Sequence, residues 1–409
     1  TNLTNYYQTT MNVCLSNALV TTGQGIEITI NGGTINKSVY GGGKNGAVAS
    51  NIDIKLLGGT VKGDIFGGGL GKDTKFSTRA GVSGPSGVTS ALANALGYEV
   101  YYTGNQDAWT SEKFVDFVKN NDTTYSRNAN YMISVGQSQS YIDGYMKPTA
   151  VKADFIQYEM LSTDTNGTKY FEVYSDVVET LGKITGDTDI SLNGSTVNGS
   201  VFGGSDGAVA NITGTTNVDI TAGTIKGNVY GGGNVAVVTN DSNVFVAGVK
   251  VPEIYGGGNI GSINGSTYVE INDGSEIDSV FAGCNQANVG GSTNLVINGG
   301  KVGSSYGGNN QSGAINTSIK TIINNGEISN VYGGGDNAGT SLDTYVTING
   351  GKITSLYGGG KNAEVKNTYI EVFEKTSIPL IIGNLYGGGF KGLVAGNTYI
   401  DLNSGTINS

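Results

Sequence analysis

The sequence predicts an all-β repeat fold, a β-solenoid built as a parallel β-helix or as stacked β-arches, with about 25 or 26 residues per coil and a small inserted α+β domain. Three observations predict it. An aromatic residue followed by small residues, mostly glycine, recurs at spacings of 25 to 29 residues. A short segment in which apolar and polar residues alternate accompanies these recurrences. One long interruption, residues 70–186, breaks the period.

Composition and charge exclude several classes. The 409 residues include 69 glycines but only 4 prolines, so the chain lacks the proline content of collagen. A hydrophobic content of 37%, in short alternating runs, argues against disorder. A net charge of -10 removes the basic footprint of nucleic-acid binding, and the absence of histidine removes the commonest metal ligand and general base.

The N-terminus and the hydropathy pattern bear on localisation. No apolar run approaches the roughly 20 residues that span a bilayer, so we expect no membrane insertion. Residues 1–20 lack the basic region and compact apolar core of a signal peptide. We therefore expect a mature chain at the cell surface or in the extracellular space.

The most specific feature is a column of aromatic residues, one at each glycine-rich corner. The column comprises Tyr40, Phe66, Phe202, Tyr230, Tyr255, Phe281, Tyr306, Tyr332, Tyr357 and Tyr386. The first corner, residues 39–46, satisfies the glycine spacing of a dinucleotide-binding turn. Such a fold needs that turn once, between a strand and a helix, whereas here it recurs with no helix-like segment after it in the repeats. We therefore expect no cofactor.

The other constant part of each coil is a strand with one buried face. Val269 and Ile271 alternate with polar residues in residues 267–274, and residues 293–300, 344–351 and 397–405 repeat the pattern. A glycine-rich corner follows, and then a shorter strand that carries the aromatic residue. We attribute the corner glycines to backbone conformations with positive φ. Stacking of coils completes the backbone ladder and the core, because one coil cannot bury its apolar face alone.

The period divides the chain into four parts. Residues 1–24 form an N-terminal segment with a partial coil, residues 25–69 the first coils, residues 70–186 the insert and residues 187–409 the main repeats. Within the insert, residues 110–120 are predicted to form a helix capped by Thr110 or Ser111. Residues 155–175 are predicted to form a hairpin that turns at Asn166 and Gly167.

Three roles are open for the aromatic column. Adjacent residues on a strand point to opposite faces, so aromatic residues next to core residues such as Val229 and Ile254 are expected to face outward. The rings then stack on one another from rung to rung, or another subunit covers them, or they bind carbohydrate.

A polar column and the acidic residues give little support to metal binding or catalysis. The position after the glycines holds Lys44, Asp206, Asn234, Asn259, Asn285, Asn310, Asp336 and Lys361. Lysine in this column does not supply calcium ligands, so we interpret it as turn chemistry. Serine and cysteine lack a histidine partner, and paired carboxylates such as Asp187 and Asp189 are typical of a solvated acidic face. We expect no metal site and no enzyme, although a polysaccharide lyase or hydrolase stays as a third alternative.

The chain ends and the two cysteines suggest contacts between copies. The sequence stops at "SGTINS", partway through a coil, which predicts an open strand edge and head-to-tail polymerisation. Cys14 stands where the aromatic residue is expected, and Cys284 replaces the last glycine of its corner. About six rungs, or roughly 29 Å, separate them, which exceeds the ~7 Å limit for a disulfide. If the two cysteines pair, they pair between molecules.

The "VYGGG" and "INGG" phrases of residues 25–69 and 187–409 resemble glycine-rich β-solenoid repeats of prokaryotic cell-surface proteins. Composition and open end also resemble the amyloid-like protein of archaeal tubular cell sheaths. That resemblance implies a structural protein that assembles with itself and has no catalytic residues. The first hypothesis is therefore an extracellular homopolymer in a sheath, fibre or surface layer. The second is an adhesin or glycan-binding β-helix.

Overall fold

The computed structural model describes residues 25–44, 46–71, 182–373 and 379–407, together with the backbone of strands within residues 75–176. The chain divides into two compact units. We call residues 20–72 and 182–409 the solenoid, and residues 73–181, which group with residues 1–19, the insert. The described residues are all-β and contain no helix. The described part of the chain therefore has no helix that is long and apolar enough to cross a bilayer.

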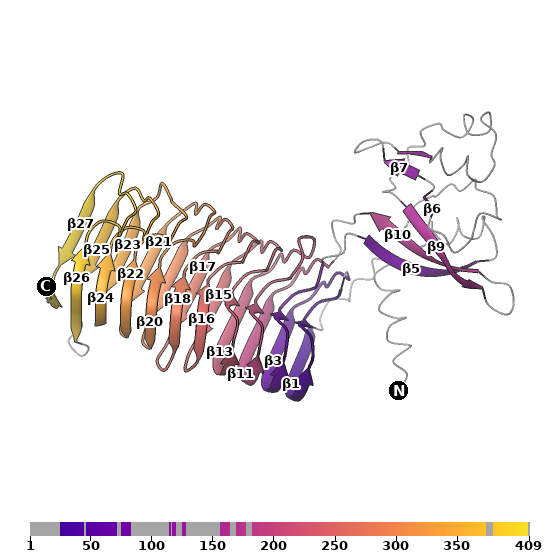
Figure 1. The fold of residues 1–409 in the computed structure, drawn as a ribbon, viewed down its shortest axis with the longest axis horizontal. Coiled ribbons are helices and arrows are strands. Elements are labelled where there is room, and N and C mark those ends of the chain that lie inside the picture. The colour runs from indigo at the N-terminus through magenta and orange to yellow at the C-terminus, as the bar shows by residue number, and fades with distance from the viewer. Residues whose placement is uncertain are drawn as a thin grey trace. The chain divides into compact units, whose positions relative to one another are not determined.

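Two eleven-stranded parallel sheets form the solenoid, and each coil adds one strand to each sheet (Figure 1). Sheet A consists of β1 (Ile26–Ile35), β3 (Ile52–Val61), β11 (Thr188–Val197), β13 (Thr216–Ile225), β15 (Ser242–Val246), β17 (Thr267–Ile271), β19 (Thr293–Ile297), β21 (Ile319–Ile323), β23 (Thr344–Ile348), β25 (Thr368–Val372) and β27 (Thr398–Leu402). Sheet B consists of β2 (Val39–Tyr40), β4 (Ile65–Phe66), β12 (Val201–Phe202), β14 (Val229–Tyr230), β16 (Lys250–Tyr255), β18 (Glu276–Phe281), β20 (Lys301–Tyr306), β22 (Glu327–Tyr332), β24 (Gly351–Tyr357), β26 (Leu380–Tyr386) and β28 (Thr406–Ile407). These sheets confirm the predicted β-solenoid.

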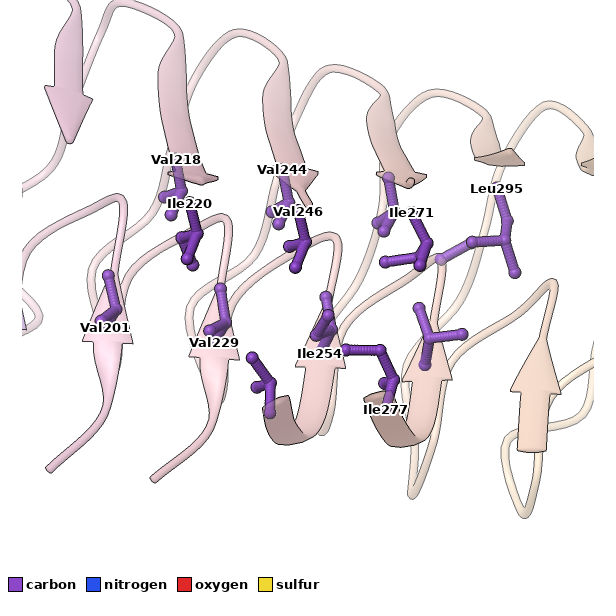
Figure 2. Close-up of a cluster of buried hydrophobic side chains, with 14 of the residues drawn as sticks. Val201, Val218, Ile220, Val229, Val244, Val246, Ile254, Ile271, Ile277 and Leu295 are labelled. Atoms are coloured by element: carbon purple, nitrogen blue, oxygen red, sulfur yellow. The ribbon is translucent and has the colours of Figure 1, made fainter. Parts of the chain in front are cut away.

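The apolar core lies between the two sheets. In Figure 2, Val218 and Ile220 of sheet A point toward Val229 of sheet B, and the same arrangement repeats in the neighbouring rungs. Val269 and Ile271 are fully buried, as the alternation predicts. A third line of parallel bridges lies in the remaining segment of the coil. It joins Val48, Ile184, Ile212, Val238, Ile263, Val289 and Ile315, and separately Val365 and Val394.

The insert does not interrupt the pairing of strands between neighbouring rungs. In sheet A, β3 pairs in parallel with β11, which places Val61 beside Val197. In sheet B, β4 pairs with β12, which places Phe66 beside Phe202. Strands on the two sides of the long interruption are therefore direct neighbours in both sheets.

The two kinds of glycine corner have different physical causes. Between the sheet A and sheet B strands, Gly300 and Gly326 have φ of 82° and 116°, as predicted. No triple-glycine corner in the described residues has positive φ, so that explanation is wrong there. A Cβ on Gly67 would collide with the carbonyl oxygen of Gly203 in the next rung. Close approach of backbones therefore requires glycine at this position, although Ala282 shows that one rung accommodates a methyl group.

The described strands of the insert belong to small antiparallel sheets. One has the order β5 (Lys75–Val82), β10 (Lys169–Asp176), β9 (Ile156–Thr163) and β6 (Phe114–Val115), and the other joins β7 (Phe117–Lys119) to β8 (Tyr125–Arg127). The predicted hairpin is confirmed, because Thr163 of β9 pairs antiparallel with Lys169 of β10. Its turn, with Asn166 and Gly167, lies outside the described residues.

The helix predicted over residues 110–120 is wrong where the structure describes that segment. Phe114 and Val115 form β6, and residues 117–119 form β7. Aromatic and β-branched residues favour strands, and Phe114 pairs with Tyr158 of β9. Backbone pairing across the insert therefore outweighs the local capping pattern.

Candidate functional site: side-chain columns and the last rung

All ten predicted aromatic residues lie in one continuous stack, which we call the aromatic ladder. Neighbouring ring centroids are 4.4–5.1 Å apart, and neighbouring ring planes differ by 3–15°. The ladder begins at Tyr40 and ends at Tyr386. Each interior ring is therefore covered by a neighbour on both of its faces.

The rings face away from the Val/Ile core, as the strand alternation predicts, and they stack on one another. The stack is buried all the same: eight rings, from Phe66 to Tyr357, form a second cluster that is 1–9% exposed. Neighbouring polar residues hold the hydroxyl of Tyr255: it accepts a hydrogen bond from Asn310 Nδ2 and donates one to Glu253, each at 3.0 Å. The chain itself, rather than a second subunit, covers these rings.

Burial also sets the ionisation of the ladder phenols. Desolvation raises the pKa of Tyr332 to about 12 and raises the pKa of Tyr230 and Tyr255. These phenols therefore stay neutral at ordinary pH, and none is poised to act as a general base.

The polar column forms a chain of amide hydrogen bonds. Asn234 donates to Asp206, Asn259 to Asn234, Asn285 to Asn259 and Asn310 to Asn285, at 2.7–2.9 Å. Each bond joins one rung to the next. The side-chain oxygens of Asp206, Asn234, Asn259 and Asn285 therefore accept hydrogen bonds from the next rung. No group of potential metal ligands occurs among the described residues.

Two further polar columns were not predicted from the sequence. Asn298, Asn324 and Asn349 each donate to the asparagine of the rung before, beginning with Asn272, at 2.8–3.0 Å. The signal in the sequence was the asparagine that follows isoleucine in the repeated phrases "INDG", "INGG" and "INNG". At the start of sheet A strands, a Thr or Ser hydroxyl donates to the carbonyl oxygen of the residue after the aromatic, at 2.6–2.7 Å. The hydroxyl donors are Thr188, Ser242, Thr267, Thr293, Thr344 and Thr368.

The paired carboxylates Asp187 and Asp189, interpreted from the sequence as part of a solvated acidic face, form hydrogen bonds to the neighbouring rung. Asp187 accepts from the backbone N–H of Thr215 at 2.7 Å, and Asp189 accepts from Asn217 Nδ2 at 2.8 Å. Both carboxylates therefore link neighbouring rungs.

Cys284 is placed unfavourably for an intermolecular disulfide. Its side chain is free and fully buried, and burial raises the pKa of the thiol to about 12. Disulfide formation requires an accessible thiolate, so the structure argues against this prediction. Cys14 lies outside the described residues.

The last described rung exposes residues of the core type. Ile370 and Val372 of β25 are 2% and 0% exposed, whereas Ile400 and Leu402 of β27 are 45% and 49% exposed. Tyr386, the last ring of the ladder, is 46% exposed. In the described part of the chain, sheet A ends at β27 and sheet B at β28, so each has an edge there.

A second aromatic stack lies on the outer face of sheet A, with Tyr345 and Tyr399 exposed and Tyr369 half-buried. Tyr345, Tyr369 and Tyr399 have centroid separations of 5.0 and 4.8 Å, with planes within 10°. The column was not singled out from the sequence, although tyrosine follows threonine in four of the repeated strands, β17, β23, β25 and β27.

The fold defines a β-solenoid repeat protein. Its aromatic, asparagine and threonine columns connect neighbouring rungs or neighbouring strands of the coils. No protein-family model, curated protein or solved structure matches the chain significantly.

Proposed function

We propose that this chain is an extracellular structural protein that assembles with further copies through its strand edges into a fibre, sheath or surface layer. The observation that carries the proposal is the repeating ladder itself, in which each rung pairs with and covers the next in both sheets and in the aromatic stack, so that a rung of another copy can continue it. Unpaired edges are templates for adding another chain. The resemblance of the repeats to cell-surface and archaeal sheath proteins supports the same role and the location outside the cell.

The glycan-binding alternative gains no support from either aromatic stack. A sugar ring stacks on the face of an aromatic ring, but ring-on-ring contacts cover both faces of every interior member. Exposed ring edges are left, together with one outer face at each end of a stack.

Electron microscopy of the purified chain and of edge variants tests the proposal. Filaments or sheets are expected for the wild type, and a double variant with Ile400→Lys and Leu402→Lys should abolish them, because a second copy cannot bury two ammonium groups without loss. Asp401→Lys is the matched control, since Asp401 is exposed on the same strand and points to its other side. Persistent monomers of the wild-type chain, or assembly unaffected by the double variant, would contradict the proposal.

A further inference from the structure

A column of alternating charges runs along five consecutive strands of sheet B. Lys250 pairs in register with Glu276, Glu276 with Lys301, Lys301 with Glu327 and Glu327 with Lys352. All five side chains are exposed. The column stops there, because the next residue in register is Ile381. We call these five residues the charge ridge.

The ridge stands between two shallow grooves of about 510 and 480 Å³. Gly274, Gly300, Gly326 and Gly351 line the first groove beside the ridge, all with positive φ. Small or short residues, including Gly303 and Ser329, line the second. The charged side chains therefore have few bulky neighbours and are open to an approaching surface.

Most charges of the ridge are not neutralised by ion pairs with other described residues. Neighbouring rungs are about 4.8 Å apart, and alternation keeps like charges from facing each other. Even so, among the five ridge residues only Lys250 and Glu276 come within ion-pair distance of each other, at 3.8 Å. Lys301, Glu327 and Lys352 make no ion pair with a described residue.

We propose that the charge ridge is a lateral contact between two copies of this chain that pack antiparallel, ridge facing ridge. A two-fold axis midway between the levels of Glu276 and Lys301 places Lys250 of each copy opposite Glu327 of the other. The same axis places Glu276 opposite Lys301, so four ion pairs of opposite sign form across the contact. A ridge of one sign has no register that pairs opposite charges. Because both copies use the same surface, the antiparallel contact is isologous and joins two chains into a closed pair.

This contact deepens the proposed assembly and rests on it in one respect. Exposed ion pairs are individually weak, so two isolated chains associate weakly. When chains join end to end, the ridge recurs along the filament and the contacts act together. The ridge thereby supplies sideways association, whereas the edge at β27 supplies growth in length.

Charge reversal with complementation tests the contact. E276K/E327K makes the ridge all lysine, and K250E/K301E/K352E makes it all glutamate. Each variant alone should lose paired filaments and lower lateral association about tenfold or more. An equimolar mixture should restore the association, because the two ridges are then opposite in sign at every rung. D219K/E371K, which makes the same change in net charge as E276K/E327K but on exposed positions of sheet A, should behave as the wild type.

The readouts separate this contact from end-to-end growth. Filament width in electron microscopy reports the ridge, and filament length reports the strand edge. Sedimentation of the mixed variants at about 10 mM and about 1 M salt tests the ridge without filaments, since a Debye length of roughly 30 Å falls to roughly 3 Å. Salt-sensitive co-sedimentation supports the proposal. Unchanged width in either single variant, or no association in the mixture at low salt, overturns it even if filaments form.

Discussion

The interior rungs and the last described rung share a sequence pattern but differ in exposure. β25 and β27 pair in register, and Ile370 lies beside Ile400. Ile370 is 2% exposed and Ile400 is 45% exposed, although both are isoleucines that follow a Thr-Tyr pair. The burial of a rung is therefore supplied by the rung that covers it and not by its own residues. A chain of identical units gains its stability at the contacts between units.

Truncating the paired isoleucines should give the largest difference. Ile370→Ala removes buried methyl groups and should lower the free energy of unfolding by about 2–5 kcal/mol. Ile400→Ala should cost less than about 1 kcal/mol in the unassembled chain, because the side chain is half exposed. Denaturant unfolding of the two variants measures the difference. Equal losses would show that the last rung is buried in solution.

The aromatic ladder offers the next comparison. Tyr357 stacks on Tyr332 and Tyr386, whereas Tyr386 stacks on Tyr357 alone within the ladder. A stacked pair contributes about 0.5–1.5 kcal/mol beyond its buried area. Tyr357→Leu should therefore destabilise the chain by about twice as much as Tyr386→Leu, as measured by the same unfolding experiment. Similar values for both would mean that stacking adds little to area burial.

The threonine column gives a smaller effect. Thr344 Oγ1 donates to the carbonyl oxygen of Gly358 at 2.6 Å in a buried setting, whereas Thr398 of the last rung is exposed. Thr344→Val keeps the shape and removes the donor, which should cost about 1 kcal/mol. Thr398→Val should change stability by less than about 0.5 kcal/mol. A neutral Thr344→Val variant would show that the hydroxyl bond makes no net contribution.

Recurrence made the fold predictable, because stacked coils repeat whatever one coil does. The spacing from Tyr230 to Tyr255 to Phe281 fixed which residues share a column, and hence that their rings stack. The burial of the rings was less predictable. The rings are buried by contacts between rungs, such as the ring stacking and the hydrogen bond from Asn310 to the hydroxyl of Tyr255, and a single repeat does not reveal such contacts.

Other features were missed for related reasons. The bridge column through Val238 and Ile263 has one apolar residue per coil, eight to ten positions after the aromatic residue in the uninterrupted coils, which is too sparse to show a strand period. In the insert, Phe114 and Val115 follow a capping pattern typical of helices, but strand pairing with β9 decided their conformation. Single-residue columns and long-range pairing are invisible to a local pattern.

The smallest effect at neutral pH concerns Cys284, whose thiol is buried in an interior rung. Its pKa is about 12 in the folded chain and about 8.5 in an unfolded one. Because the folded value is raised, the contribution of the neutral thiol is fully present below pH ~8.5 and is lost as the pH rises toward 12. In a C14S background, Cys284 should not react with a maleimide at neutral pH and should react fully in denaturant. Above pH ~9 the stability of this protein should fall more steeply than that of a variant with Cys284→Ala added. Labelling of the native chain at the rate of an exposed thiol would show that this rung opens in solution. The interior rungs would then be less protected than the burial of Cys284 indicates.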